Sequence, residues 1–254
     1  MSGERAPARP RPPGDPIMTW LIAQRAALES LRDPFSLLLG LIFAVGVPLA
    51  LLVLAIGPTA DHDASGSTAG ALFNTYVLVV GVLPAFSAVG IAAGQFAGEK
   101  ERGLLTPLLA SPASNVAIFV GKVLGAIIPP LVYAAVAEAV YFVGAGVLAG
   151  SGVVGRVSPS LTVATLLLVP AVACFAAVVA SLISSRVRSF NAAQQLSGLA
   201  LMPVWAATFG LATHAQEWEP LALYGAVAVL LLVDAALMVL AGSTWRREEV
   251  LAQR

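Results

Sequence analysis

Two carboxylates stand inside long uncharged stretches of this sequence: Glu138 in "VLGAIIPPLVYAAVAEAVYFVGAGVLAG" and Asp234 in "LYGAVAVLLLVDAALMVLAG". A carboxyl group in such surroundings can carry a proton or contact a polar solute, and it costs about 2.5 kcal/mol or more in hydrocarbon. We therefore expect both side chains to face the protein interior. Two interpretations stay open: a polar contact on a translocation path or dimer seam, or a protonated carboxyl bonded to a neighbouring helix.

A second chemically active group is the charged cluster of "GEKERGLLTPLLASP", which runs from Glu99 to Arg102 and is followed by Gly103. The glycine permits a turn, and the leucines after it are too few to cross a bilayer. They need lipid headgroups or a protein groove to bury them. The alternative interpretation is a stop-transfer flank at a helix end.

Other reactive residues predict no catalytic or metal site. His62 lies between Asp61 and Asp63, but three adjacent residues do not converge easily on one ion. Cys174 is the only cysteine, which excludes a disulfide within the chain. Several amides in or beside the apolar stretches are interpreted as interhelical hydrogen-bonding groups: Asn74, Gln95, Gln194 and Gln195. Asn74 is also a candidate for the translocation path or the dimer seam.

The elements that must position these residues are membrane-spanning helices. The sequence is 58% hydrophobic and only 11% charged, against roughly 25% charged residues in soluble domains. Uncharged runs of about twenty residues recur, which is the length that an α-helix needs to cross a bilayer, and no alternating barrel pattern is present. The predicted spans are Leu37–Gly57, Ala71–Ala97, Val123–Ala149, Leu161–Ile183, Gln195–Ala212 and Leu221–Gly242. Gly144, Gly146 and Gly150 could allow close helix packing.

The basic residues alternate from one connection to the next. All but Arg156 of the 14 lie before the first span, between the second and third, between the fourth and fifth, or after the sixth. This positive-inside pattern predicts that both termini lie in the cytoplasm. The basic residues on the predicted cytoplasmic side are Arg5, Arg9, Arg11, Arg25, Arg32, Lys100, Arg102, Lys122, Arg186, Arg188, Arg246, Arg247 and Arg254.

The N-terminal region divides into a tail and a helix. "RAPARPRPPGDP" is rich in proline and arginine, as disordered segments are, and "PIMTWLIAQRAALESLRDP" has the pattern of an interfacial amphipathic helix. Pro34 is expected to end that helix. The expected domains are a disordered cytoplasmic tail over residues 1–16, the interfacial helix over 17–33, a six-span domain over 34–245 and a cytoplasmic tail over 246–254.

The stretch "GEKERGLLTPLLASPASNVAIFVGKVLGAI" resembles the cytoplasmic signature of permease subunits of type 2 ATP-binding-cassette (ABC) exporters. In that signature, an acidic cluster ends the second span and a Gly-Lys pair opens the third. The stretches "LRDPFSLLLGLIFAVGVPLALL", "RVRSFNAAQQLSGLALMPV" and "STWRREEVLAQR" agree with the family's elbow helix and first span, its entry to the fifth span and its C-terminal tail. The proline in "GLLTP" departs from the commoner Gly-Thr-Leu and leaves the start of the short helix open.

The resemblance implies an all-α membrane protein with an elbow helix and a coupling helix between spans two and three. It implies no enzyme activity in this chain, because a separate cytoplasmic ATPase, in two copies, would bind ATP and magnesium. A homodimer, or a heterodimer with a second permease, would form the pathway in the plasma membrane. The residues it assigns to the ATPase-coupling loop are Glu99, Glu101, Arg102, Gly103, Leu105, Leu108, Leu109, Pro112 and Lys122.

The residues themselves agree with this division, since the sequence contains no Gly-x-x-x-x-Gly-Lys-Ser/Thr phosphate loop. Short external connections and apolar spans favour a hydrophobic or amphipathic solute. Two other classes of function stay open. A secondary transporter or channel could use Glu138 and Asp234, and an intramembrane enzyme is the less favoured alternative because no nucleophile and base occur at a recognisable spacing.

Overall fold

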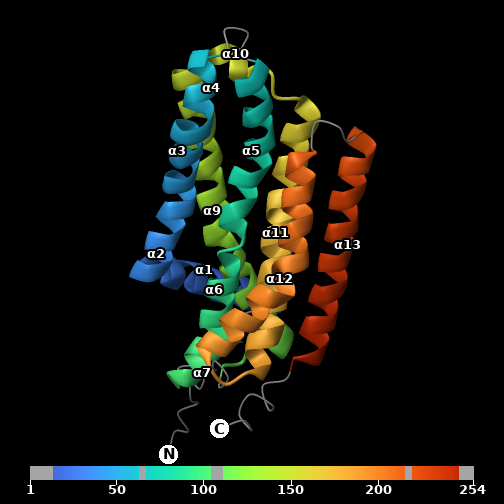
Figure 1. Cartoon of the computed structure of the whole chain (residues 1–254). Coiled ribbons are helices and arrows are strands. Elements are labelled where there is room, and N and C mark those ends of the chain that lie inside the picture. Colours follow the sequence, from blue (N-terminus) through green and yellow to red (C-terminus); the bar gives the residue numbers. More distant parts are fainter. Residues whose placement is uncertain (1–13, 63–66, 104–110, 215–218, 246–254) are drawn as a thin grey trace, which may run out of the picture.

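The computed structural model describes residues 14–62, 67–103, 111–214 and 219–245, and within these ranges the chain forms helices and no strands. Most of the predicted tail over residues 1–16 lies outside them. So do Leu105, Leu108 and Leu109 of the predicted coupling loop and the C-terminal tail. Cartoon views of the described helices show one upright bundle with a helix laid across it near one end (Figure 1).

Six helical segments are long and apolar enough to cross a membrane, which confirms the predicted number of spans. Each contains the whole of its predicted counterpart and extends beyond it at one or both ends. The fifth is continuous through Pro203, although its polar entry weakens its hydropathy. The segments are Pro34–Ala60, Ser67–Glu101, Asn115–Ala149, Pro159–Arg186, Phe190–Thr213 and Pro220–Thr244.

The first two spans are each built from several helical pieces. The first contains α2 (Pro34–Leu41), η1 (Ile42–Gly46), α3 (Val47–Leu51), η2 (Leu52–Ile56) and the start of α4 (Gly57–His62). The second contains α5 (Ser67–Ala85), α6 (Ala88–Ala93), η3 (Gly94–Gly98) and α7 (Glu99–Glu101). Pro84 precedes the turn between α5 and α6, where the Ser87 hydroxyl donates to the Pro84 carbonyl at 2.7 Å.

The remaining spans are single helices, and three of them begin directly after a serine. They are α9 (Asn115–Ala149), α11 (Pro159–Arg186), α12 (Phe190–Thr213) and α13 (Pro220–Thr244), and the short α10 (Ser151–Val154) follows α9. Ser114, Ser158 and Ser189 cap α9, α11 and α12 by accepting a hydrogen bond from a backbone N–H of the first turn.

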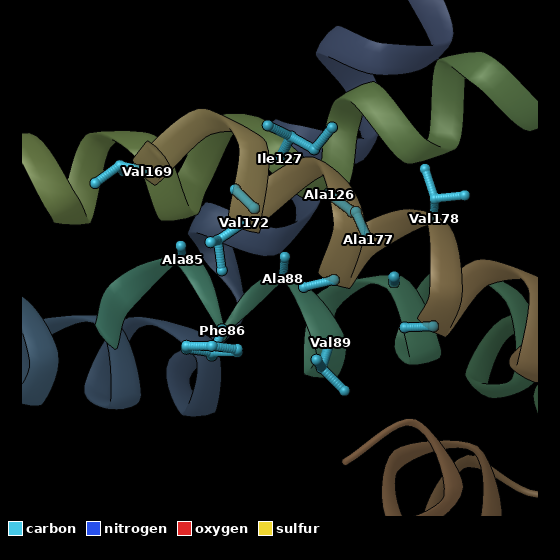
Figure 2. Packing of buried hydrophobic residues seen from close by; sticks show 14 of the residues in the cluster. Ala85, Phe86, Ala88, Val89, Ala126, Ile127, Val169, Val172, Ala177 and Val178 are labelled. Carbon is cyan, nitrogen blue, oxygen red and sulfur yellow. The ribbon is translucent and has the colours of Figure 1, made fainter. Parts of the chain in front are cut away.

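The second and third spans form the centre of the bundle. Within the most apolar windows of these helices, 72% and 67% of residues are buried, against 22% in the first span and 17% in the sixth. Alanine and valine side chains of α5, α6, α9 and α11 fill the space between them (Figure 2). The first and sixth spans therefore present most of their apolar surface outward, to lipid or to another chain.

The helix laid across the bundle is α1 (Asp15–Arg32), which corresponds to the predicted interfacial helix (Figure 1). It ends one residue before Asp33, whose carboxylate caps α2 by accepting from the Ser36 N–H at 2.8 Å. Its face toward the bundle carries Ala23, Ala26 and Ala27, while Trp20 and Leu21 are exposed. A small-residue face thus packs inward, and larger apolar side chains are left for the membrane interface.

Two glycines of α9 allow α1 to approach closely. A Cβ at Gly125 would lie 2.5 Å from the Ala26 Cβ, and one at Gly121 would lie 2.8 Å from the Thr19 carbonyl oxygen. At the other end of α9, Gly144 makes room for Leu52, whose Cδ1 would meet an added Cβ. Between these contacts α9 contains Pro129 and Pro130. The prediction that Gly144 permits close packing is confirmed, whereas Gly150 has open space around it and a positive φ of 83°.

Candidate functional site

The charged cluster at the end of the second span joins that span to the third. The Lys122 ammonium of α9 lies 2.7 Å from the Glu99 carboxylate and donates to the Gln95 carbonyl oxygen at 2.5 Å. It also lies 5.3 Å from the centre of the Phe96 ring. Lys122 is only 3% exposed, and its buried charge is compensated by an ion pair, a carbonyl oxygen and an aromatic ring.

The next two residues of the cluster reach two further spans. The Lys100 ammonium donates to the carbonyls of Ser185 and Val187, at 3.1 and 3.2 Å, where α11 ends. A cation suits this position because the last carbonyls of a helix carry partial negative charge. The Glu101 carboxylate accepts from the Phe190 N–H at 3.0 Å, at the start of α12. A carboxylate is favourable there for the complementary reason.

Three consecutive residues therefore connect α7 to three different helices. Glu99 binds α9, Lys100 binds the end of α11, and Glu101 binds the beginning of α12. We call this arrangement, Glu99 to Glu101 with their partners, the α7 junction. It lies at the end of the bundle where α1 crosses (Figure 1). The segment 104–110 begins three residues after the junction ends.

The other described residues of the predicted coupling loop follow the α7 junction in the chain. Arg102 follows α7 and is exposed, and Gly103 has a φ of 69°, in the region that favours glycine. Pro112 lies just before the Ser114 cap of α9. The family resemblance assigned Lys122 to the coupling loop, as part of the Gly-Lys pair that opens the third span, and that span was predicted to begin at Val123. Lys122 lies instead inside α9, because Ser114 starts that helix at Asn115.

A cavity of about 260 Å³ opens beside the junction. The elbow formed by α1 and α2, the lower part of the second span and the start of α12 enclose it. Charged, amide and aromatic side chains all contribute to its wall. They include Asp33, Phe35, Gln95, Glu101, Arg102 and Phe190.

The exposed polar face of α1 carries an ion pair near this cavity. Arg25 Nε lies 2.7 Å from the Glu29 carboxylate one turn later. The hydrogen bond and the negative charge of Glu29 raise the pKa of Arg25 above its ordinary value. Because both side chains are largely exposed, we expect this pair to contribute little to stability.

Glu138 lies in α9 with both carboxyl oxygens buried and without a hydrogen-bond partner among the described residues. A Cβ at Gly81 would lie 2.5 Å from its Oε1, and Thr165 and Val169 of α11 border the same place. The carboxyl group therefore lies between α5, α9 and α11 of one chain. The expectation that it faces the protein interior agrees with this position.

Asp234 and Asn74 also lie within the bundle. Asp234 is 4% exposed although α13 is largely open to its surroundings, and neither of its carboxyl oxygens has a partner in the described ranges. Asn74 donates from Nδ2 to the Gly70 carbonyl at 3.0 Å and, at 3.5 Å, to the Arg156 carbonyl. Its amide thus contacts the connection that follows α10.

Several residues of the site were not identified from the sequence. Gln95 was interpreted as an interhelical hydrogen-bonding group, yet its side-chain amide is buried and has no partner within the described part of the chain. Asp33 and Phe35 flank Pro34, and no charge pattern or spacing in the sequence indicates that they line a cavity. Phe190 contributes a backbone N–H, and no side-chain pattern identifies such a contact.

Helices of this length and composition define a multi-pass membrane protein. A family model described as ABC-2 type transporter matches residues 18–218. The match covers well over half of the chain, and the chain therefore belongs to the ABC-2 type transporter family, as a permease subunit. No curated protein matches the sequence. The match confirms the resemblance seen around "GEKERGLLTPLLASP".

Proposed function

We propose that this chain forms half of the membrane pathway of an ATP-driven exporter, with ATP hydrolysis supplied by a separate cytoplasmic ATPase. The ATPase, in two copies, would bind ATP and magnesium, and two permease chains, identical or related, would enclose the path. The family assignment supports an ABC permease. The basic residues support a cytoplasmic location for both termini and for the α7 junction.

The α7 junction is the observation that carries this proposal. A partner that pushes on the segment 104–110 pushes on α7, because that segment follows α7 almost directly. Side chains of α7 contact α9, α11 and α12 within 2.7 to 3.2 Å. Force applied at one short segment would then reach four spans at once. A stop-transfer flank needs no such set of contacts.

The solute is proposed to be hydrophobic or amphipathic, because the spans are apolar and the connections away from the junction are short. We also propose that Glu138 takes part in the working cycle. A buried carboxyl without a partner costs free energy, and a partner gained when the helices move would offset that cost. Asp234, whose carboxyl oxygens are also buried without a partner among the described residues, stays a candidate for the path or the dimer seam. Asn74 stays a candidate too, because its Oδ1 is likewise buried without a partner in the described ranges.

The test of the coupling role is co-purification of the ATPase with the full-length permease, together with solute-stimulated ATP hydrolysis in reconstituted vesicles. Leu105→Asp and Leu109→Asp each place a charge where an apolar contact with the ATPase is expected, which typically costs a few kcal/mol. We expect ATPase recovery or coupling to be lost, while membrane insertion persists. The matched control is Leu221→Asp at the start of α13, where Leu221 is 81% exposed at the opposite end of the bundle.

Wild-type recruitment and hydrolysis in both leucine variants would contradict the coupling role and favour a stop-transfer flank. Transport by the permease in the complete absence of an ATPase would favour a secondary transporter or channel. A stable complex with the ATPase that accumulates solute inside the cell would retain the coupling role and overturn the export direction.

A further inference from the structure

The sixth span is in contact with the rest of the bundle along one narrow face. Only 17% of the residues in its most apolar window are buried, and α13 packs mainly against α11. The buried face carries Leu223, Val227, Asp234 and Ala241, which recur at helical spacing. Trp245 follows one turn after Ala241, directly after the helix ends. This side chain decides what the end of the sixth span contacts.

Trp245 is buried, in contrast to the tryptophan of the interfacial helix. It is 6% exposed, whereas Trp20 of α1 is 54% exposed. Tryptophans at membrane surfaces usually lie among the lipid headgroups, with a polar N–H that stays hydrated. The Trp245 indole N–H is buried and has no partner among the residues that the structure describes. The ring is therefore held by packing within the bundle and not as a lipid anchor.

Three aromatic rings from three spans meet at this point. The Trp245 ring centre lies 6.3 Å from those of Phe96 in η3 and Phe119 in α9, and the two phenylalanine ring centres lie 5.6 Å apart. These separations are typical of favourable aromatic pairs. A Cβ at Gly242 would lie 3.8 Å from Val116 of α9, so the end of α13 also approaches that helix. Trp245 thus joins the end of the sixth span to the second and third spans.

The same rings border the buried ion pair of the α7 junction. The Lys122 ammonium lies 5.3 Å from the centre of the Phe96 ring and pairs with Glu99. Phe119 lies three residues before Lys122, and these two side chains share a face of α9. Because buried side chains pack closely, a displacement of the ion pair displaces the rings beside it. Trp245 is therefore in line to follow the junction.

We propose that Trp245 is a positioning residue that holds the sixth span to the α7 junction, so that the junction moves five spans and not four. Asp234 lies about three turns before Trp245 on the same face of α13. A shift of Trp245 therefore also shifts the Asp234 carboxyl group along α11. That the junction moves during ATP hydrolysis rests on the proposed function, whereas the packing of Trp245 against the junction does not.

The first test needs no ATPase and uses the full-length chain in phosphatidylcholine nanodiscs. Trp245 becomes the only tryptophan when the other three are replaced by phenylalanine, namely Trp20, Trp205 and Trp218. Glu99→Gln in this background removes the counter-ion of Lys122. We expect the Trp245 fluorescence to shift to the red, because a buried ammonium without its counter-ion draws in water. The matched control is Glu29→Gln, which breaks the exposed pair with Arg25 and should leave the emission unchanged.

The second test uses the permease–ATPase complex in reconstituted vesicles. Trp245→Leu removes the ring and keeps an apolar side chain. We expect ATPase recruitment to persist while the solute transported per ATP falls about tenfold. Trp245→Phe should stay within about twofold of the wild type, since it keeps a ring and the indole N–H has no described partner to lose. Trp20→Leu, the same substitution at an exposed tryptophan, is the matched control.

The apparent melting temperature of each variant establishes that it folds. Unchanged Trp245 emission in a folded Glu99→Gln variant, or wild-type coupling in Trp245→Leu, would overturn the inference. An equal loss of coupling in Trp245→Phe and Trp245→Leu would overturn it too, because the aromatic ring would then not be the feature that matters. If Trp245→Leu does not fold, the emission test decides, because it keeps Trp245 in place. A wild-type complex without solute-stimulated hydrolysis, together with the expected emission shift, would remove the proposed function and leave the contact of Trp245 with the junction intact.

Discussion

The Lys122 ammonium and the Glu99 carboxylate lie 2.7 Å apart and join the third span to the second where Lys122 is almost completely buried. Such a pair contributes little net stability compared with apolar residues of the same size, because both charges lose their hydration. Losing one partner alone is far more costly. The pair is therefore a fixed connection between two spans.

Glu99→Gln should destabilise the protein by about 3 kcal/mol or more, because it leaves the Lys122 charge buried without its counter-ion. The double variant Glu99→Gln/Lys122→Met should recover most of that loss. Cys174 is the only cysteine of the chain and is partly buried, so a thiol-reactive fluorogenic dye can report unfolding on heating. Equal melting temperatures for wild type and Glu99→Gln would contradict the ion pair.

Gly125→Ala should displace α1, because the new Cβ would lie 2.5 Å from the Ala26 Cβ and 2.9 Å from the Ala23 carbonyl oxygen. Neither atom belongs to a flexible side-chain end. We expect a loss of about 1 to 3 kcal/mol despite the better helix propensity of alanine. Gly146→Ala in the same helix meets nothing nearer than 3.8 Å and is the matched control. The thiol-reactivity melting assay compares the two, and an equal effect would contradict the close crossing.

The proposed orientation predicts which ends react with an impermeant thiol reagent in intact cells. In a Cys174→Ser background, Ser151→Cys in α10 should be labelled, and Ser243→Cys near the end of α13 should not. Both serines are exposed, and the substitution is conservative at each. Labelling of the Ser243→Cys variant alone would show that the orientation is the reverse of the one proposed. The α7 junction would then not be cytoplasmic.

Glu138→Gln should reduce solute-stimulated transport while the melting temperature stays within about 1 °C of the wild type. The reason is that the carboxyl group has no hydrogen-bond partner to lose among the described residues. Transport in reconstituted vesicles and dimer recovery by cross-linking are measured together. Unchanged transport and assembly would favour a packing role between α5, α9 and α11.

The sequence was sufficient for the number of spans, because uncharged runs of the right length can only be helices in a bilayer. It placed span ends less well where polar residues belong to the helix. The third span was predicted to begin at Val123, because Lys122 was interpreted as a charged residue of the preceding connection. Its counter-ion, Glu99, lies on another helix, and such a partner cannot be deduced from the residues next to Lys122. The Ser114 cap was the local signal that could have corrected this.

The candidate site was only partly predictable for a similar reason. The cluster at Glu99 was recognised because charge is rare in this chain, but its partners lie 23 to 89 residues away along the sequence. Contacts such as Glu101 with the Phe190 N–H involve the backbone and depend on tertiary packing. Gln95 and Asp33 meet around one cavity only because α1 lies across the bundle.

The two adjacent prolines of α9 divide that helix into two segments that can bend relative to each other. Its 35 residues extend about 52 Å, and the crossing with α1 holds one end while Leu52 packs against Gly144 near the other. Pro129 and Pro130 lie between these two points and cannot donate the backbone hydrogen bonds that stiffen a helix. If α9 tilts at the end where it contacts α1 and where Lys122 pairs with Glu99, it would bend at the prolines. The half that contains Gly144 can then keep its orientation while the half that contains Lys122 moves.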